Sequence, residues 1–193
     1  MKPGSADPYV YPGTSILINK PGFRDAAALD RFERMTTAQR LSEGLPNIPF
    51  TRKGYCSLHH HLFQDVYVWA GKIRTVAIAK NNSLFCRAEY VDRELDKRMD
   101  MIRSEKGWRG LKLTGFIERA AGHIAEINAI HPFREGNGRT KRALLVVLGK
   151  HAGHAVAIQH IDAAKWNEAS RISFRNGDLT LMQEVLAEVT VAP

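Results

Sequence analysis

The stretch His131-Pro132-Phe133-Arg134-Glu135-Gly136-Asn137-Gly138-Arg139-Thr140-Lys141-Arg142 lies between two apolar helical segments and sets how they meet. Upstream, residues 111–130 carry hydrophobic side chains at intervals of three and four, which predicts a helix with one buried face. Pro132 disfavours helical backbone at the residue before it, so we expect this helix to end at His131. A second helix, predicted over 139–151, is almost wholly apolar in its middle. Two buried helices joined by a tight loop would hold residues 131–142 rigidly.

The glycines of this stretch favour binding of an anion. Gly136, Asn137 and Gly138 precede the second helix, where unpaired N–H groups carry partial positive charge and glycine lets them approach a ligand closely. Arg139 and Arg142 are three residues apart, so both lie on one side of the first turn and can reach the same phosphates. The spacing is not that of a P-loop, which needs Gly-Lys-Ser/Thr. No strand precedes the glycines, which argues against a dinucleotide-binding turn.

Two ionisable side chains add candidate chemistry to the same stretch. Glu135 is a hard oxygen donor beside a phosphate site, which suits a magnesium ligand. The ordinary pKa of a histidine side chain lies near neutral pH, so His131 suits a general base. Taken singly, such a histidine is more often a helix-end residue that caps a carbonyl, and such a carboxylate is usually a solvated surface charge. Together in one loop between buried helices, and with Phe133 as an anchor, they predict a functional site.

The rest of the chain predicts an all-α fold with a small β-hairpin. Residues 1–22 are rich in proline and glycine and predict an irregular arm. A strand is expected over 72–80, returning after a turn over 84–86, and this is the one convincing β signal. A first helix is expected from Asp25 to the break at Gly44. Further helices are expected at about 54–69 (ended by Gly71), 88–105, 111–130, 139–151, 162–173 and 178–188.

Composition narrows the class of protein. The 193 residues, 44% hydrophobic and 25% charged, suit one soluble domain over 1–193. No apolar run is long enough for a membrane span, and the start of the chain lacks the core of a signal peptide. With only Cys56 and Cys86, a reduced cytoplasmic protein is expected. The net charge of +8 is spread without a basic block, so we expect a small anionic ligand or an acidic partner and no direct nucleic acid.

Residues 131–142 resemble the signature of the Fic family, His-x-Phe-x-Asp/Glu-Gly-Asn-Gly-Arg-x-x-Arg, at every fixed position. The likeness extends to Tyr9-Val10-Tyr11-Pro12-Gly13 in the N-terminal arm, to the run from Asp65 to Arg74, and to Asn176-Gly177-Asp178-Leu179. The chain resembles the bacterial Fic toxins of toxin–antitoxin modules. This implies the Fic fold, a helical bundle with a flap hairpin at 72–87, and a protein adenylyltransferase (AMPylase).

The resemblance implies transfer of AMP from ATP to a Tyr, Ser or Thr hydroxyl of a target protein, with release of pyrophosphate. His131 would deprotonate the hydroxyl, and Glu135 would hold Mg²⁺ on the α- and β-phosphates. The amides of Gly136 and Gly138, with the Asn137 side chain, would orient the α-phosphate. Arg139 and Arg142 would grip the β- and γ-phosphates.

The resemblance also assigns the flap and the type of transfer. The flap would pair with the target as an added strand, with Lys80 beside the nucleotide. Its target-docking residues would be Val76, Ala77, Ile78 and Ala79. Kinase-like relatives carry Lys at the position of Gly138, so the small residue favours AMP transfer over phosphate transfer.

Family members are often inhibited by a Ser/Thr-x-x-x-Glu-Gly/Asn helix whose glutamate pairs with the arginine matching Arg142. The chain contains no such motif, so we expect a separate small antitoxin to supply it. The resemblance also implies a type II topoisomerase, gyrase or topoisomerase IV, as the target. Two other functions stay open from the residues: a phosphotransferase of the same fold, and a non-catalytic nucleotide- or nucleic-acid-binding regulatory module.

Overall fold

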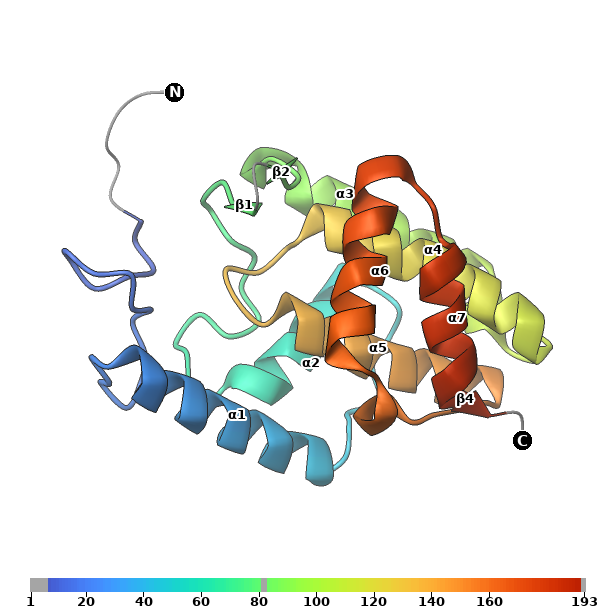
Figure 1. Ribbon diagram of the computed structural model, residues 1–193, viewed down its shortest axis with the longest axis horizontal. Helices are drawn as coiled ribbons and strands as arrows, with labels where there is room; N and C mark the ends of the chain where they lie inside the picture. Colours follow the sequence, from blue (N-terminus) through green and yellow to red (C-terminus); the bar gives the residue numbers. More distant parts are fainter. Residues whose placement is uncertain (1–6, 81–82, 192–193) are drawn as a thin grey trace.

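The structure is a computed structural model that describes residues 7–80 and 83–191, and in that part of the chain it is mainly helical (Figure 1). Along this part of the chain, two helices precede the hairpin region and five follow it. Their bounds are α1 Ala26–Ser42, α2 Arg52–Phe63, α3 Ala88–Ser104, α4 Leu113–Ile130, α5 Asn137–Ala152, α6 Ala163–Asn176 and α7 Thr180–Val189. Short 3₁₀ turns lie at Lys106–Trp108 and Ile158–His160. The expected all-α class with a small β-hairpin is confirmed.

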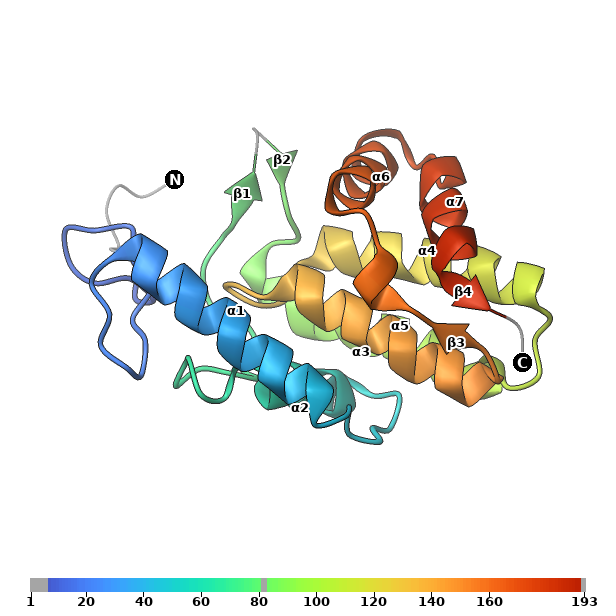
Figure 2. The ribbon, with the colours of Figure 1, turned by 60° about the horizontal axis from the view of Figure 1, so that its bottom comes forward.

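Helix α4 is the centre of the molecule. It packs against α3, α5, α6 and α7, while α2 packs against α1 and α5. In Figure 2 α6 and α7 lie on one side of α4 and α5, and α1 and α2 lie on the other. The side chains of Phe116, Ala120, Ile124 and Ile127 on α4 are fully buried. These residues form the apolar face that the sequence predicts. Its burial against the neighbouring helices holds α4 in place.

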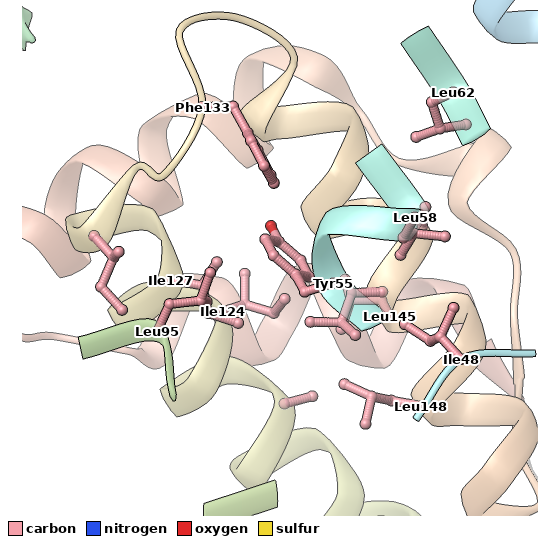
Figure 3. Packing of buried hydrophobic residues seen from close by; sticks show 14 of the residues in the cluster. Ile48, Tyr55, Leu58, Leu62, Leu95, Ile124, Ile127, Phe133, Leu145 and Leu148 are labelled. Carbon is pink, nitrogen blue, oxygen red and sulfur yellow. The ribbon is translucent and has the colours of Figure 1, made fainter. Parts of the chain in front are cut away.

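The hydrophobic core reaches directly to the loop between α4 and α5. Phe133 is fully buried and points from this loop toward Tyr55 of α2, whose ring is stacked 5.6 Å away (Figure 3). Leu145 and Leu148 of α5 lie below in the same cluster. The loop is thus packed on the core by an aromatic anchor, as the sequence predicts.

The prediction of a helix over 54–69 is wrong at its C-terminal end. Helix α2 ends at Phe63, and the chain turns back toward it instead of reaching Trp69 in helical form. Two contacts hold the turn: Arg40 binds Asp65 at 2.7 Å, and the N–H of Gly71 donates to Nδ1 of His59 at 2.8 Å. This turn buries Val66, Tyr67, Trp69 and Ala70 and leaves Val68 exposed. The spacing of Val66 and Trp69 fits a helix, which explains the incorrect prediction.

The β structure also differs from the prediction. The strand expected over 72–80 is limited to β1, Ala79–Lys80, which pairs antiparallel with β2, Ser83–Leu84. A second antiparallel pair joins β3, Ala155–Val156, to β4, Thr190–Val191. The sequence gives no signal for it, because two-residue strands are too short to show alternation. Over the residues described, every helix is too short or too polar to cross a lipid bilayer.

Candidate active site

His131 stands where α4 ends. It adopts a left-handed backbone (φ 49°, ψ 62°), and its N–H still donates to the carbonyl of Ile127 at 3.0 Å. A left-handed non-glycine residue is uncommon and marks a position fixed by its surroundings. The imidazole stacks on Phe85, with ring centroids 3.9 Å apart and planes inclined by 17°. The residue after β2 therefore orients the ring of the candidate base.

Residues 132–136 fold into a loop closed by Asn137. Its side chain accepts from the N–H of Phe133 at 3.0 Å and donates to the carbonyl of Phe133 at 2.8 Å. Both polar atoms of this buried amide are thus engaged inside the loop, and its observed task is to shape the loop. The role toward the α-phosphate that the resemblance implies for this side chain stays a prediction.

Position 136 requires glycine for two reasons, its backbone conformation and its close contact with Phe63. It has φ 83°, and a Cβ there would lie 2.3 Å from the ring of Phe63. The residue caps α5, whose first amides follow it and face the loop. At Gly138 a Cβ would meet only Nη1 of Arg142, at 3.7 Å. That distance is an ordinary van der Waals contact, and the room for the β- and γ-phosphates that the resemblance implies at Gly138 stays a prediction.

His59 of α2 ties the loop to the scaffold. Because its Nδ1 accepts from Gly71, its Nε2 carries the proton and donates to the carbonyl of Glu135 at 3.0 Å. The ring is fully buried and lies on Phe133, with centroids 3.8 Å apart. Burial lowers the pKa of His59 to about 3, so the ring stays neutral and the tautomer fixed. The structure shows no cluster of three metal-binding side chains in the described residues, including around His59–His61.

Arg74 joins the base of the flap to the active-site loop. Its guanidinium is buried and donates to the carbonyls of His131 at 2.7 Å, Val76 at 2.6 Å and Cys86 at 2.5 Å. Its own N–H binds the carbonyl of Pro132 at 2.9 Å. Burial lowers the pKa of Arg74. The guanidinium therefore links three segments by hydrogen bonds to their carbonyls, and it fixes the flap relative to His131.

The N-terminal arm closes the opposite side of the same junction. Asp7 forms an ion pair with Arg134 of the loop at 2.9 Å. The hydroxyl of Tyr9 accepts from the N–H of Thr75 at 3.2 Å, and its ring packs edge-on against Trp69. The arm, the flap base and the loop are thus held as one unit.

Glu135 is exposed at the mouth of the loop. One carboxylate oxygen accepts from the N–H of Gly136 at 2.8 Å, and the side chain is 47% exposed. A single carboxylate next to a phosphate site fits Mg²⁺, which keeps several waters and takes its other ligands from the nucleotide. The donor set therefore suits that ion with nucleotide bound.

The two arginines of the stretch have different surroundings. Arg139 binds the carboxylate of Glu33 on α1, and its Nη1 lies 3.4 Å from the hydroxyl of Thr37. The guanidinium of Arg142 makes no hydrogen bond or ion pair within residues 7–80 and 83–191. Burial, and secondly the charge of Arg139, lower the pKa of Arg142. Arg142 is thus the cation left available to an anion.

Along one edge of the flap, backbone groups form no hydrogen bond to the residues that the structure describes. The carbonyl of Ile78 accepts from the N–H of Phe85 at 3.1 Å, so Ile78 faces β2. By strand alternation Ala77 and Ala79 turn their N–H and C=O groups away from β2. Val76 and Ile78 are half-buried, and Ala77 and Ala79 are exposed. Lys80 belongs to β1, but its side chain lies outside the part of the chain that is described.

Sequence reasoning missed three residues of this site: Glu33, His59 and Arg74. Each acts through contacts with segments far along the chain, and none belongs to a local motif. The spacing of Glu33 on α1 gives one weak signal, since it falls one turn after Leu29 on the buried face. A charged residue at a core position of a helix indicates a buried partner.

Comparison with known proteins agrees with this geometry. The model of the Fic/DOC family matches residues 49–148. The probable protein adenylyltransferase y4lH of Sinorhizobium fredii is 38% identical over 174 residues, covering 90% of each chain. The probable protein adenylyltransferase Fic of Escherichia coli is 34% identical, covering 95% of this chain and 92% of its own.

One longer relative and one solved structure extend the comparison. The protein adenylyltransferase VbhT of Bartonella schoenbuchensis is 37% identical over 97% of this chain, which spans 41% of that relative. The crystal structure of BepC from Bartonella tribocorum, with bound AMPPNP, superimposes with a TM-score of 0.87 over 96% of this chain and 97% of its own, at 24% identity. That likeness concerns the fold. By the family match and its full-length relatives, this chain belongs to the Fic/DOC family.

Proposed function

We propose that this protein transfers AMP from ATP to a Tyr, Ser or Thr hydroxyl of a target protein and releases pyrophosphate. The chain is an enzyme of the protein adenylyltransferase class, as are its relatives at 38% and 34% identity over most of their length. The observation that carries the proposal is the fixed ring of His131 beside a glycine-rich helix N-terminus and an available arginine.

In the proposed reaction His131 takes the proton of the target hydroxyl. The hydroxyl oxygen then bonds to the α-phosphorus, while the bond from that phosphorus to the oxygen bridging to the β-phosphate breaks. Pyrophosphate leaves with the bonding electrons, and AMP stays on the target as a phosphodiester. The first amides of α5 would stabilise charge on the α-phosphate, and Arg142 the charge that grows on the leaving group.

Mg²⁺, when bound, would neutralise phosphate oxygens and favour departure of pyrophosphate. Glu135 would hold it, because this exposed carboxylate lies at the start of α5. Arg139 would support the phosphate end of the site while paired to Glu33. Asn137 would act by fixing the loop on Phe133.

The target would dock on the flap by adding a strand. The outward edge at Val76, Ala77, Ile78 and Ala79 supports this, because its N–H groups at Ala77 and Ala79 turn away from β2. The flap base is anchored to the His131 carbonyl through Arg74. A strand on this edge would therefore pass the candidate base at a fixed place, and Lys80 would lie on the nucleotide side.

Labelled ATP tests the transfer. A bacterial lysate is incubated with the protein and with ATP labelled on the α- or the γ-phosphate. We expect protein-bound label from the α position only, and none with His131→Ala. Label from the γ position would instead identify a phosphotransferase. No transfer from either position, with nucleotide binding unchanged in His131→Ala, would identify a non-catalytic binding module.

A separate antitoxin helix is proposed as the inhibitor. A groove of about 860 Å³ runs from Arg142 along α5 and beside the end of α1. Among the described residues that line it, Arg109, Arg142 and Lys150 are charged, and all three are cationic. Most of its other lining residues are apolar: Leu41, Leu45, Phe50, Val146, Val147, Val156 and Ile158. This chemistry suits an amphipathic acidic helix whose glutamate reaches Arg142.

Growth of cells tests this inhibitor. Expression of the chain alone should arrest growth, and co-expression of the antitoxin should restore it. Lys150→Glu, which reverses a groove cation two turns along α5 from Arg142, should escape the antitoxin and still transfer AMP. Ser42→Ala, at a neutral residue that also lines the groove, is the control. Equal rescue of wild type and Lys150→Glu would remove the groove from the proposal.

The target and setting are proposed from the likeness to Fic toxins. Gyrase or topoisomerase IV is the proposed target. The labelled-ATP assay with purified topoisomerase in place of the lysate tests it. The proposal also treats residues 1–193 as one domain in the reducing cytoplasm. Two observations support this: most of the buried apolar residues form one continuous cluster, and Cys56 and Cys86 are both free thiols.

A further inference from the structure

Glu33 is a buried carboxylate that reaches into the site from α1. Its side chain is 8% exposed, and both of its oxygens are used: one accepts from Arg139 and the other from the hydroxyl of Tyr67. Leu29 and Thr37, one turn to either side, belong to the same buried face. A carboxylate in such a place is retained only when it is paired.

Arg139 has a second carboxylate within reach. Its Nη2 lies 3.8 Å from Glu135, which is four residues earlier and on the same side of the turn. Glu33 binds the same Nη2 more closely, and Thr37 and the ring of Phe63, 4.8 Å away, complete the surroundings of the guanidinium. Apart from that distant ion pair, the one bond of the Glu135 carboxylate to the described part of the chain is from the N–H of Gly136 at 2.8 Å, and its side chain is 47% exposed.

We propose that Glu33 is a positioning residue that takes the guanidinium of Arg139 and so leaves the Glu135 carboxylate to the cation. Without the Glu33 charge, the nearest carboxylate to Arg139 is Glu135. An arginine–carboxylate pair there would compete directly with a divalent ion for the same oxygens. The proposal rests on the proposed function only in taking Glu135 as the magnesium ligand.

Arg139 and Arg142 differ in whether a carboxylate of the protein pairs with them. Arg139 is neutralised inside the protein, whereas Arg142 is not. Removing the charge of Glu33 should therefore weaken binding of the metal ion and change the affinity for the metal-free nucleotide little. A purely structural role of Glu33 would affect both equally, or only thermal stability.

Binding of a non-hydrolysable ATP analogue tests this without catalysis. Its Kd is measured in EDTA and in magnesium, and the ratio of the two gives the gain in affinity due to the metal. Glu33→Gln keeps the shape and should reduce this ratio about tenfold, the loss typical of a residue that orients a metal ligand. The Kd in EDTA should stay within about twofold of wild type. Asp30→Asn, on the exposed face of α1, should change neither value.

A second background isolates the mechanism. In Arg139→Gln the guanidinium of residue 139 no longer competes for Glu135. The double variant Glu33→Gln/Arg139→Gln should therefore show the same ratio of Kd in EDTA to Kd in magnesium as Arg139→Gln alone. The double variant removes the buried carboxylate and its partly buried partner cation together, so neither is left without a counter-charge, and it is usable even if Glu33→Gln alone fails to fold. A further loss of the ratio in the double variant would overturn the proposal, as would an unchanged ratio in Glu33→Gln. If wild type shows no metal-linked gain, or Glu135→Ala does not reduce it, the magnesium assignment itself fails.

Discussion

Individual residues in this protein combine a backbone constraint with a contact, and Gly136 is the clearest case. An alanine there would adopt a left-handed backbone and place its Cβ 2.3 Å from Phe63. We expect Gly136→Ala to lower the free energy of unfolding by about 3 kcal/mol, from backbone strain plus overpacking. Gly177→Ala, with φ 76° and no atom within 4 Å, should lose only the backbone part, about 1 kcal/mol. Urea unfolding measures both, and equal losses would contradict the contact with Phe63.

His59 makes stability depend on pH. Its pKa is about 3 in the folded protein because of burial, below the usual value near 6.5. The unfolded chain therefore binds the proton first, and stability falls as pH is lowered from about 6.5 toward 3. Above about pH 5, before carboxylates titrate, His59 contributes a slope of up to about 1.4 kcal/mol per pH unit. His123, with a pKa of about 4, adds a slope of the same sign.

Urea midpoints at a series of pH values check this slope. His59→Gln should be less stable than wild type at neutral pH and should show a shallower fall toward pH 5. The exposed His160→Gln is the control and should keep the wild-type slope. A wild-type slope in His59→Gln would show that His59 is not the titrating group.

Among the elements, the flap base depends on one side chain. Arg74 donates to carbonyls of His131 at the end of α4, of Val76 in the flap and of Cys86 in the segment after β2. Arg74→Lys keeps the charge but cannot reach all of them, so we expect a loss of about 3 kcal/mol in unfolding free energy. AMP transfer should fall as well, because the flap loses its fixed place. Arg93→Lys on the exposed face of α3 should change stability little, and a similar loss there would contradict the special role of Arg74.

The flap edge gives a prediction about the target. Ala77→Pro removes an N–H group that faces away from β2. Modification of the target should fall by at least about tenfold, as one hydrogen bond and its register are lost, whereas nucleotide affinity should not change. Ala77→Ser keeps the N–H group and is the matched control. Full activity of Ala77→Pro would exclude docking through this edge.

Elements also show where sequence reasoning succeeds. Helix α4, its end at Ile130 and the start of α5 follow from periodicity and Pro132, because these signals are local. The end of α2 does not, since it depends on Arg40 and Gly71 closing a turn. The pairing of β3 with β4 joins segments more than thirty residues apart and has no local pattern.

At the scale of the whole molecule, packing brings separate segments to one loop. The sequence locates the residues 131–142 but not the three side chains that hold them: Glu33 from α1, His59 from α2 and Arg74 from the flap base. A single-chain motif can predict which atoms react. Their supports become visible only when the helices are placed around α4.

The central claim is that His131 directs AMP, and not phosphate, onto a protein hydroxyl. Tandem mass spectrometry of the target modified by the protein with unlabelled ATP tests this claim most directly. We predict an AMP phosphodiester on a Tyr, Ser or Thr side chain, formed by wild type and absent with His131→Ala. A phosphoryl group in its place, or the same AMP adduct formed equally by His131→Ala, would contradict the account.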